Sequence, residues 1–462
     1  MNKFNIVTGS DSYKFCHSEM YPENTQNVYS YFESRKGARF GKTLFFGLQG
    51  LIKDYLQGVV VTKENIDTAE KRITAHIGPN LFHREKWDYI VEKHGGKLPL
   101  RIRAVKEGTL VPVDNVLMDV EATDEKCFWL TNYVETLLTH VWFPSTVATL
   151  SKEVKDSCLY FLNKSADKND SIAFMLHDFG FRGTSSFESA STGGAGHLVN
   201  FMGTDTFPAI EYVMDNYNTN EVVAYSVAAS EHSINCALGL EGEALVIKNL
   251  LDKYPTGILS VVSDSFDIFN CVENIIGGTF RDRILAREGK FVVRPDSGDP
   301  LTTTLRLIEI LGDKFGVTYN SKGYKVLNPK IGLIWGDGID IEGINIILNG
   351  LVANMWSAEN IVFGMGGGLL QKVNRDTQRF AFKSAAQKRD GIWHDVYKNP
   401  LDQSKASKRG KLKLIKKDGK FMTVRQDDNN YINDTDLLEL VFENGEVVRE
   451  MTFQEIRDNS NK

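Results

Sequence analysis

Residues 332–368 read GLIWGDGIDIEGINIILNGLVANMWSAENIVFGMGGG, in which short apolar runs end in glycine-rich or acidic segments. The apolar runs at 332–335 and 360–363 predict strands, and the segment between them has the length and composition of a helix. A strand, a helix and a second strand within about thirty residues form a βαβ unit, whose two strands lie parallel. This stretch therefore predicts a parallel α/β fold.

The same pattern recurs upstream, with apolar runs at 172–176, 198–202, 222–227, 258–262 and 291–293. Polar residues mark the exits of the seven runs at intervals of 23 to 43 residues: Arg182, Asp205, His232, Asp264, Arg294, Asp337 and Gly366. Seven strand–helix units in succession predict an α/β fold with an irregular parallel α/β barrel. Because all strand exits of such a barrel open on one face, we expect these polar residues to converge there.

The rest of the chain has a different pattern. Residues 43–56 have helical spacing, residues 98–105, 109–113 and 115–120 resemble strands, and residues 123–163 are helical with a division at Pro144. We therefore expect an N-terminal α+β and helical segment at 1–165, the barrel as catalytic domain at 166–380, and a C-terminal segment at 381–462.

The composition of the chain argues against several classes of function. The 462 residues carry 54 Lys and Arg against 60 Asp and Glu, a net charge of −6, which argues against nucleic acid as the main partner. The charge-free run 136–151 is shorter than the ~20 apolar residues of a membrane span, and the first residues do not resemble a signal peptide. The five cysteines form no C-x-x-C pair, so we expect a cytoplasmic protein with neither a disulfide framework nor a zinc site.

Two exits are candidates for binding phosphate or a metal. Gly364 and the glycines at 366–368 follow a predicted strand and precede a helical run at 369–375, so backbone N–H groups there can hold a phosphate. The spacing matches neither the Rossmann nor the Walker motif, and close strand–helix packing is the structural alternative. Asp337, between Gly336 and Gly338, can face a ribose hydroxyl or Mg²⁺, or belong to an ordinary turn.

Other strand exits contain charged or aromatic side chains that could bind a ligand. In residues 294–300, RPDSGDP, Arg294 can grip a phosphate or carbonyl, whereas Asp299 before Pro300 is typical of a helix N-cap. In HDFGFRG, Arg182 offers a phosphate contact and Phe179 a stacking face, although such a Phe is usually core. His232, next to Glu231, can act as a base or phosphoryl acceptor, although a lone histidine is more often structural.

Residues 398–420 contain nine Lys or Arg against two Asp. The alternation at 411–416 and the Asp418-Gly419 turn predict a solvated β-hairpin. The alternative function is attraction of a di- or triphosphate.

Taken together, these residues resemble one family, the nicotinamide phosphoribosyltransferases, which are type II phosphoribosyltransferases. The similarity runs almost end to end, and the motifs that carry it are DSYK at 11–14, HDFGFRG, GTDT, ASEHS, SVVSDS, RPDSG, GDG and FGMGGGLLQK. The resemblance implies a type II phosphoribosyltransferase barrel with an additional α+β domain, in which the C-terminal segment packs back on the N-terminal one.

The resemblance also implies an activity. The family transfers the 5-phosphoribosyl group of 5-phosphoribosyl 1-diphosphate to nicotinamide, giving nicotinamide mononucleotide and diphosphate in NAD salvage, with Mg²⁺ on the diphosphate and ATP as co-substrate. It implies a homodimer with shared active sites and no membrane partner. The pyridine ring would stack between Phe179 and Tyr13 of the second subunit, with Asp205 accepting from the amide nitrogen and Ser260 and Arg294 near the amide oxygen.

The remaining roles follow from the same resemblance. His232 matches the histidine that ATP phosphorylates, and Glu231 and Asp264 would hold its imidazole. Asp296 and Asp337, beside Gly336, match ribose or Mg²⁺ contacts. The matched contacts to phosphate are Arg182, Arg294, Gly366, Gly367, Arg375, Lys383, Lys398 and Lys405.

One position departs from the family, since Ala381 stands where relatives commonly have serine. The alternatives are a nicotinate phosphoribosyltransferase, which a neutral or basic residue at position 205 would favour, and a non-catalytic nucleotide-binding relative. A sugar-phosphate aldolase or isomerase would need a lysine or an acid–base pair at the exits, and the exits contain no lysine.

Overall fold

The computed structural model describes residues 4–398 and 407–462, and the chain forms two compact units. Unit 1 comprises residues 1–149, 212–220 and 374–462, and unit 2 comprises residues 150–211 and 221–373. The predicted segments end at residues 165 and 380, whereas the first unit boundary falls inside helix α6 (Trp142–Ser165). Residues 212–220, which the sequence analysis places in the barrel, belong to unit 1.

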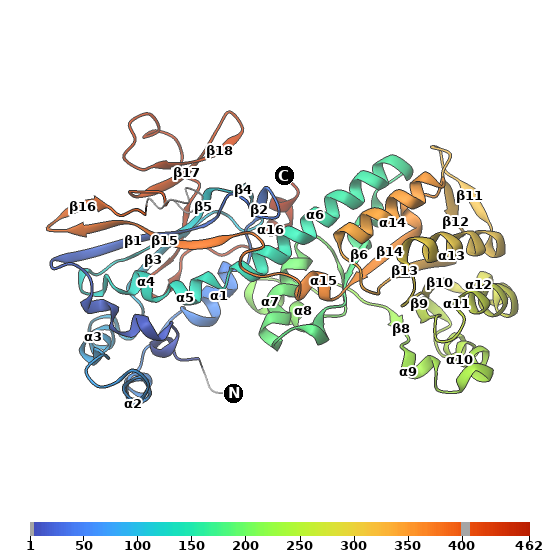
Figure 1. Cartoon of the computed structure of the whole chain (residues 1–462), viewed down its shortest axis with the longest axis horizontal. Helices are drawn as coiled ribbons and strands as arrows, with labels where there is room; N and C mark the ends of the chain where they lie inside the picture. Colours follow the sequence, from blue (N-terminus) through green and yellow to red (C-terminus); the bar gives the residue numbers. More distant parts are fainter. Residues whose placement is uncertain (1–3, 399–406) are drawn as a thin grey trace. The chain divides into compact units, whose positions relative to one another are not determined.

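Unit 2 contains a seven-stranded sheet in the order β7-β6-β14-β13-β10-β9-β8, and every paired neighbour runs parallel. Its strands are β6 (Leu176–Asp178), β7 (Gly203–Thr204), β8 (Ala228–Ala229), β9 (Thr256–Val262), β10 (Glu288–Arg294), β13 (Ile331–Trp335) and β14 (Ile361–Met365). Figure 1 labels all of them except β7. All five residues of β13 are buried, as expected for a parallel strand covered on both faces.

The sheet closes on itself just before β8. A parallel bridge joins Gly203 to Tyr225, with Tyr225 N donating to Met202 O at 2.8 Å and Thr204 N donating to Tyr225 O at 3.1 Å. The segment before β8 therefore reaches the opposite edge strand, β7. The predicted irregular parallel barrel is confirmed.

The last four predicted strands are correct, but the first three are misplaced. Residues 170–174 form a 3-10 turn, residue 198 ends helix α7 (Phe187–Leu198), and β8 begins after the predicted run at 222–227. Backbone hydrogen bonds still connect these runs, because Met202 N donates to Ala173 O at 2.8 Å. The three predicted segments are therefore neighbours in the barrel, but the strands themselves, β6, β7 and β8, contain only two or three residues each and lie at or just after the ends of these segments.

The helices of unit 2 follow their strands. They are α7, the first half of α8 (Phe207–Asn216), whose residues 212–216 belong to unit 1, and α9 (His232–Asn235), α10 (Gly239–Lys253), α11 (Ile268–Asn270), α12 (Arg281–Ala286), α13 (Pro300–Phe315), α14 (Ile341–Ala353) and α15 (Gly367–Leu370). The unit also contains a π-helical segment at Cys271–Thr279 and a hairpin of β11 (Val317–Tyr319) and β12 (Lys325–Leu327). Helix α13 shows how sequence sets these boundaries. The Asp299 side chain accepts from Thr302 N at 2.9 Å, Pro300 opens the first turn, and Gly316 at φ +88° ends the helix.

Unit 1 is built on an antiparallel sheet in the order β16-β15-β1-β5-β3-β19-β20. The strands of this sheet are β1 (Thr25–Ser34), β3 (Leu100–Ala104), β5 (Asn115–Ala122), β15 (Phe380–Arg389), β16 (Ile392–Asp395), β19 (Glu439–Glu443) and β20 (Glu446–Val447). Two further antiparallel pairs are β2 (Lys42–Leu44) with β4 (Leu110–Pro112), and β17 (Leu412–Lys417) with β18 (Lys420–Arg425). The predicted strands at 98–105, 109–113 and 115–120 are confirmed. The C-terminal β15 and β19 pair directly with β1 and β3.

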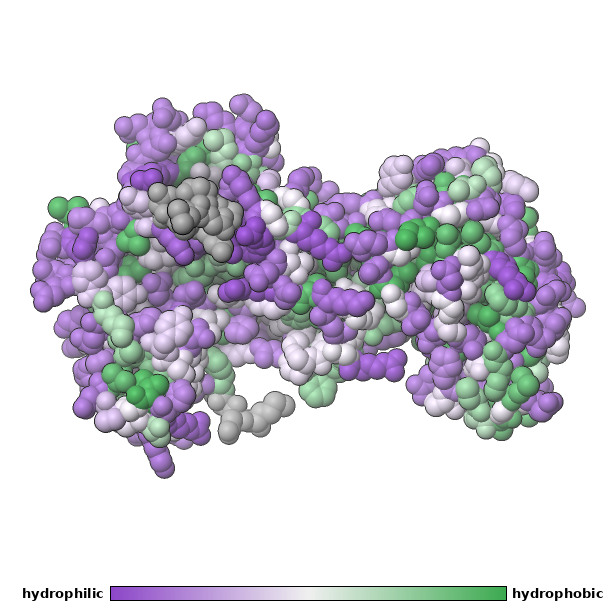
Figure 2. Space-filling view, viewed as in Figure 1, coloured by the Kyte–Doolittle hydropathy of each residue, from purple (hydrophilic) through white to green (hydrophobic). Residues whose placement is uncertain are grey.

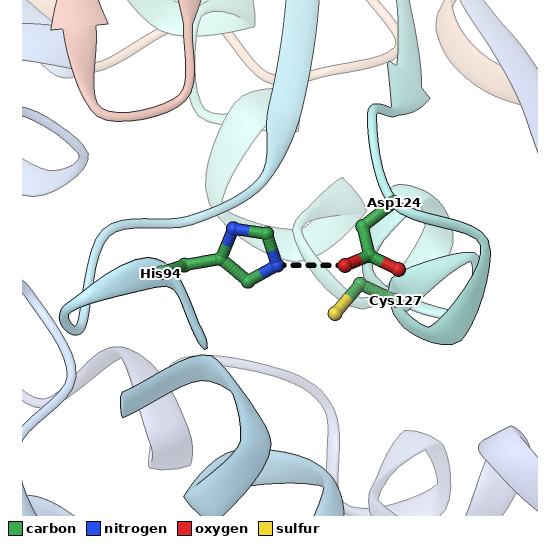
Figure 3. A group of neighbouring side chains, drawn as sticks. All are labelled: His94, Asp124 and Cys127. Atoms are coloured by element: carbon green, nitrogen blue, oxygen red, sulfur yellow. Dashed lines mark hydrogen bonds and ion pairs between the residues drawn. The ribbon is translucent and has the colours of Figure 1, made fainter. Parts of the chain in front are cut away.

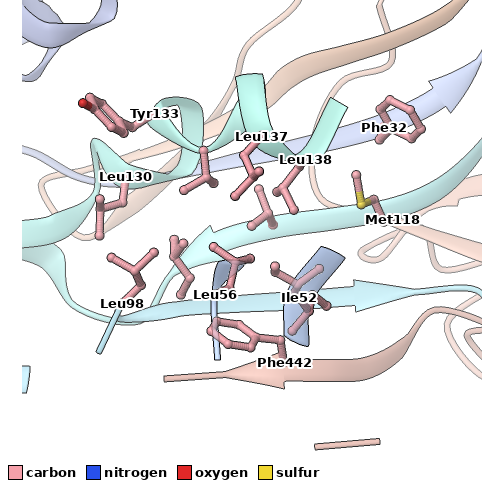
Figure 4. Packing of buried hydrophobic residues seen from close by; sticks show 14 of the residues in the cluster. Phe32, Ile52, Leu56, Leu98, Met118, Leu130, Tyr133, Leu137, Leu138 and Phe442 are labelled. Atoms are coloured by element: carbon pink, nitrogen blue, oxygen red, sulfur yellow. The ribbon is translucent and has the colours of Figure 1, made fainter. Parts of the chain in front are cut away.

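Unit 1 buries one large apolar cluster against this sheet, and Figure 4 shows part of it, including Ile52, Leu56, Leu138 and Phe442. The helices are α1 (Leu48–Tyr55), α2 (Lys63–Ile77), α3 (Arg84–His94), α4 (Leu130–Tyr133), α5 (Glu135–Thr139), the start of α6, and α16 (Phe453–Ser460).

Two helical predictions in unit 1 need correction. The predicted helix at 43–56 begins only at Leu48, because residues 42–44 form β2. The predicted division at Pro144 falls slightly earlier, between the end of α5 at Thr139 and the start of α6 at Trp142. Pro144 itself lies in the first turn of α6, where its missing N–H breaks no helical hydrogen bond.

Helices α9 and α10 and the turn between them carry four exposed apolar side chains: Ile234, Leu238, Leu240 and Leu245. Figure 2 shows green, apolar atoms over the region of these helices. Contiguous exposed apolar surface is typical of a face that another molecule covers. In the ranges 4–398 and 407–462, no helix is both long and apolar enough to cross a bilayer.

Candidate active site

The carboxyl ends of the parallel strands in unit 2 open on one face. Asp205 N donates to Asp178 O at 2.9 Å, which ties the exit of β7 to that of β6, and Ser263 N donates to Arg294 O at 3.0 Å, which ties β9 to β10. Most of the predicted site residues belong to this unit: Phe179, Arg182, Asp205, Glu231, His232, Ser260, Asp264, Arg294, Asp296, Gly336, Asp337, Gly366 and Gly367.

Phe179 leaves β6 and lies directly on the backbone of two neighbouring strands. A Cβ atom at Gly364 would be 2.0 Å from Cε2 of the Phe179 ring, and one at Gly336 would be 3.3 Å away. Real Cβ atoms do not approach carbon at 2.0 Å, so Gly364 is required for this ring position. The ring remains partly exposed and available for stacking.

Asp205 is an exposed carboxylate at the exit of β7, next to the strand that carries Phe179. Its Oδ1 accepts a hydrogen bond from Ser226 Oγ. The second oxygen of the carboxylate can accept from a ligand N–H. Ser260, close to the end of β9, is buried, and its carbonyl accepts from Ser230 N at 2.9 Å.

His232 opens helix α9 and contacts two carboxylates. Its Nε2 lies 3.0 Å from Asp264 Oδ1, and its Nδ1 lies 3.8 Å from Asp296 Oδ2. The Asp264 side chain is 5% exposed, and its other oxygen accepts from Ser297 Oγ. A carboxylate oxygen is a hydrogen-bond acceptor, so Nε2 of His232 is the donor in the contact with Asp264. Glu231, expected beside the imidazole, accepts a hydrogen bond from Ser233 Oγ instead.

Three carboxylates face one another at the exits of β9, β10 and β13. Burial raises the pKa of Asp337 above its ordinary value, and the negative charges of Asp296 and Asp264 raise it further. Carboxylates that repel one another in this way are stabilised by a divalent cation, and oxygen ligands are those that Mg²⁺ prefers. Asp296 and Asp337 therefore fit the predicted metal role.

Two arginines supply positive charge to the same face. Arg182 is exposed, and Arg294 lies at the end of β10. The buried Nε of Arg294 has no hydrogen-bond partner within the described part of the chain. A buried guanidinium donor without a protein acceptor is suited to an anionic or carbonyl ligand.

The glycine-rich exit of β14 differs from the prediction in one respect. Helix α15 begins at Gly367 and contains four residues, whereas the sequence predicts a helical run at 369–375. Any phosphate contact at Gly366 and Gly367 would therefore come from exposed backbone N–H groups and not from the dipole of a long helix.

The other predicted site residues belong to unit 1. Tyr13 lies on a 3-10 turn (Ser12–Glu19) with its ring 62% exposed, and Arg375 and Lys398 are exposed. Lys383, on β15, is half-buried. Burial lowers the pKa of its ammonium group, and the positive charge of nearby Arg35 lowers it further. Lys405 lies outside the described residues.

The basic segment forms the predicted hairpin, β17 and β18, with Asp418 and Gly419 at positive φ in the turn. It is less solvated than predicted, because the buried Lys413 ammonium donates to the carbonyl oxygen of Asp434 at 3.1 Å. Lys408 and Lys411 also pair with carboxylates. Two of the nine basic residues of the segment are therefore paired with carboxylates within unit 1.

Three contributing residues were not singled out from the sequence. Ser226 and Ser297 orient Asp205 and Asp264, and the buried Asp178 accepts from Gly180 N at 2.7 Å in the turn that follows Phe179. Burial raises the pKa of Asp178 to about 6. Each lies in or next to an exit segment, which is the only signal that could have identified it.

Comparisons with known proteins agree with this arrangement. A model of the nicotinate phosphoribosyltransferase (NAPRTase) family matches residues 174–446, and a model of the nicotinamide phosphoribosyltransferase N-terminal domain matches residues 5–102. Two solved structures share the fold. Nicotinate-nucleotide pyrophosphorylase from Pyrococcus furiosus has a TM-score of 0.63 and 15% identity, and the match covers 100% of this chain and 96% of the other. Human nicotinic acid phosphoribosyltransferase has a TM-score of 0.58 and 14% identity, with 98% of this chain and 92% of the other covered. The fold and the matched family define a phosphoribosyltransferase.

Sequence relatives narrow this class. A nicotinamide phosphoribosyltransferase from Xanthomonas campestris pv. campestris is 44% identical over 98% of this chain and 97% of its own length. Proteins of the same name from Acinetobacter baylyi and Mycoplasma pneumoniae are 33% and 34% identical, over 98% and 87% of this chain and 97% and 94% of their own lengths. The chain belongs to the nicotinamide phosphoribosyltransferase family.

Proposed function

We propose that this enzyme transfers the 5-phosphoribosyl group from 5-phosphoribosyl 1-diphosphate to nicotinamide, as a step of NAD salvage. The pyridine nitrogen attacks C1 of the ribose, the bond from C1 to the diphosphate oxygen breaks, and nicotinamide mononucleotide and diphosphate form. The names of the relatives at 33–44% identity support the choice of substrate.

The observation that carries the proposal is the Asp205 carboxylate at the exit next to Phe179. With one oxygen bonded to Ser226, its other oxygen is available to accept from the amide N–H of nicotinamide. The same charge would repel the carboxylate of nicotinate. Phe179 would stack on the ring together with Tyr13 of a second subunit, and Ser260 and Arg294 would lie near the amide oxygen.

The diphosphate would be held by positive charge and backbone donors. Arg182, Arg294 and the N–H groups of Gly366 and Gly367 would contact phosphate in unit 2, and Arg375, Lys383, Lys398 and Lys405 would do so from a partner subunit. Mg²⁺ held by Asp296 and Asp337 would neutralise charge on the leaving diphosphate. These groups stabilise charge that develops as the bond breaks, so the reaction needs no general base.

Shared sites require a homodimer. The exposed apolar side chains of α9 and α10 support an interface on unit 2, since surface of this kind is usually covered in an assembly.

We also propose that ATP stimulates synthesis through a phosphohistidine at His232. The hydrogen bond from Nε2 to Asp264 leaves Nδ1 as the nucleophile. Nδ1 would attack the γ-phosphorus of ATP, and ADP would leave with the electrons of the broken bond. The phosphorylated site would then bind the Mg²⁺-diphosphate in a more favourable arrangement.

The decisive assay measures mononucleotide formation from 5-phosphoribosyl 1-diphosphate, Mg²⁺ and either nicotinamide or nicotinate, with and without ATP. Nicotinamide mononucleotide stimulated by ATP is expected. Preference for nicotinate would refute the role of Asp205, and absence of product from both bases would favour a non-catalytic nucleotide-binding protein. Asp205→Asn should reduce kcat/KM for nicotinamide by roughly 10- to 100-fold, because it removes the charge of the acceptor and replaces one of its two oxygens with an NH2 group that cannot accept. His232→Ala should remove both ATP stimulation and phosphate incorporation from γ-labelled ATP, and unchanged stimulation would refute the phosphohistidine.

A further inference from the structure

Unit 1 contains a compact group of metal-binding side chains that the proposed reaction does not use. The ligand atoms of His94, Asp124 and Cys127 all lie within 4.8 Å of one another, and Figure 3 shows the three side chains converging from two segments. Nε2 of His94 is 2.8 Å from Oδ2 of Asp124.

Local structure fixes the position of each ligand. Helix α3 ends at His94, because Gly95 takes the left-handed conformation at φ +61°. Asp124 caps the 3-10 turn Glu125–Cys127 with Oδ1, which accepts from Lys126 N at 2.8 Å, so Oδ2 faces His94. The turn places Asp124 and Cys127 three residues apart on the same side, which is the spacing of a C-x-x-C zinc turn with the first ligand replaced by a carboxylate.

The chemistry of the three ligands selects the cation. Imidazole nitrogen, carboxylate oxygen and thiolate sulfur together suit a borderline divalent ion and not Mg²⁺ or Ca²⁺, which take oxygen ligands. We propose that His94, Asp124 and Cys127 form a Zn²⁺ site with three protein ligands and a fourth position for water. Zinc bonds of about 2.0–2.3 Å place neighbouring tetrahedral ligands roughly 3.2–3.8 Å apart, so the site closes around the ion by small side-chain movements.

The surroundings favour this use. Tyr89 Oη donates to the Asp124 carboxylate at 3.0 Å, which is the kind of outer hydrogen bond that orients a metal ligand. Cys127 is buried beside this carboxylate.

The consequence is a second metal site, distinct in chemistry from the acidic cluster of unit 2. Zinc would join the end of α3 to the start of the turn at 125–127, two segments now held by the His94–Asp124 and Tyr89–Asp124 hydrogen bonds. Because only the folded chain presents the three ligands together, zinc should stabilise the folded state.

The test titrates the full-length protein with Co²⁺ as a spectroscopic substitute for Zn²⁺. We expect one equivalent to give a sulfur-to-cobalt charge-transfer band, which Zn²⁺ abolishes by displacement. Co²⁺ at Asp296 and Asp337 has only oxygen ligands and gives no such band. In the absence of added Co²⁺, Zn²⁺ should raise Tm.

Variants separate metal binding from structural roles. Cys127→Ser should abolish the band, whereas Cys158→Ser, which changes an equally buried thiol in unit 2, should retain it. His94→Gln keeps a donor for Asp124 but offers a poor zinc ligand, so it should retain the apo Tm and lose the Tm increase with Zn²⁺. No charge-transfer band in the wild-type protein, or a band that persists in Cys127→Ser, would overturn the proposal.

Discussion

Replacing Gly364 with alanine tests whether the position of the Phe179 ring determines base binding. The new Cβ would lie 2.0, 2.2 and 2.7 Å from three atoms of that ring, too close for a shift of a few tenths of an ångström to relieve. Since the obstructed atoms belong to a rigid ring, either β14 or Phe179 must move. Overpacking of this kind costs about 1–3 kcal/mol of folding free energy.

Gly332→Ala is a matched control on the neighbouring strand β13. Its Cβ would meet the flexible Lys290 side chain at 3.2 Å and Val292 at 3.6 Å, so that variant needs only a small adjustment. A difference between the two variants therefore reports the position of the ring and not the loss of a glycine in a parallel strand.

The assay combines thermal unfolding with steady-state kinetics. Stacking of a base on an aromatic ring contributes about 1–3 kcal/mol, so loss of half of that contribution raises KM for the pyridine base roughly 3- to 10-fold. Gly364→Ala should therefore lower Tm and raise this KM, and KM for 5-phosphoribosyl 1-diphosphate should change much less. Equal Tm and equal base KM in both variants would refute the reasoning.

Three further predictions concern Asp178, Asp299 and Ser297. Because burial raises the pKa of Asp178 to about 6, the folded state keeps a proton that the unfolded chain loses above about pH 4, and stability falls as pH rises through that window. Asn cannot ionise, so the free energy of unfolding of Asp178→Asn should rise relative to that of wild type by up to about 3 kcal/mol between pH 4 and pH 7, as measured by denaturant unfolding. A difference between the two proteins that does not change with pH would contradict the raised pKa. Asp299→Ala should lower the free energy of unfolding by about 1 kcal/mol, because α13 loses its N-cap, whereas Asp299→Asn should lower it little. Equal losses for the two variants in chemical denaturation would exclude a capping role. Ser297→Ala should reduce the ATP-dependent increase in rate about tenfold and the ATP-independent rate less, because Ser297 orients Asp264; equal reductions would argue for a structural role.

The strands with apolar runs were predictable because most residues of each run are buried in a parallel sheet. In β13, all five residues are buried, and the run in the sequence coincides with the strand. The strand pairings at β6, β7 and β8 involve only two or three residues, and hydrogen bonds such as that from Met202 N to Ala173 O determine where they form. No local pattern in the sequence carries that information.

The candidate site shows the same division between local and tertiary information. His232, Asp264 and Asp296 stand out because charged residues at strand exits are unusual, and the structure brings them together. Ser297 was visible inside its motif, but its hydrogen bond to Asp264 depends on two different exits. Cys127 was set aside because no second cysteine stands nearby, and its neighbours His94 and Asp124 become apparent only when the chain is folded.

The pairing of β1 with β15 has a consequence during translation. Strand β1 contains residues 25–34, but its partner β15 contains residues 380–389 and leaves the ribosome long afterwards. The barrel strands of unit 2 are synthesised between the two and can pair before unit 1 is complete. Until then one edge of β1 lacks its partner and offers backbone donors and acceptors to other nascent chains. A chain truncated before residue 374 would keep that edge permanently unpaired, so we expect it to require chaperones or to aggregate.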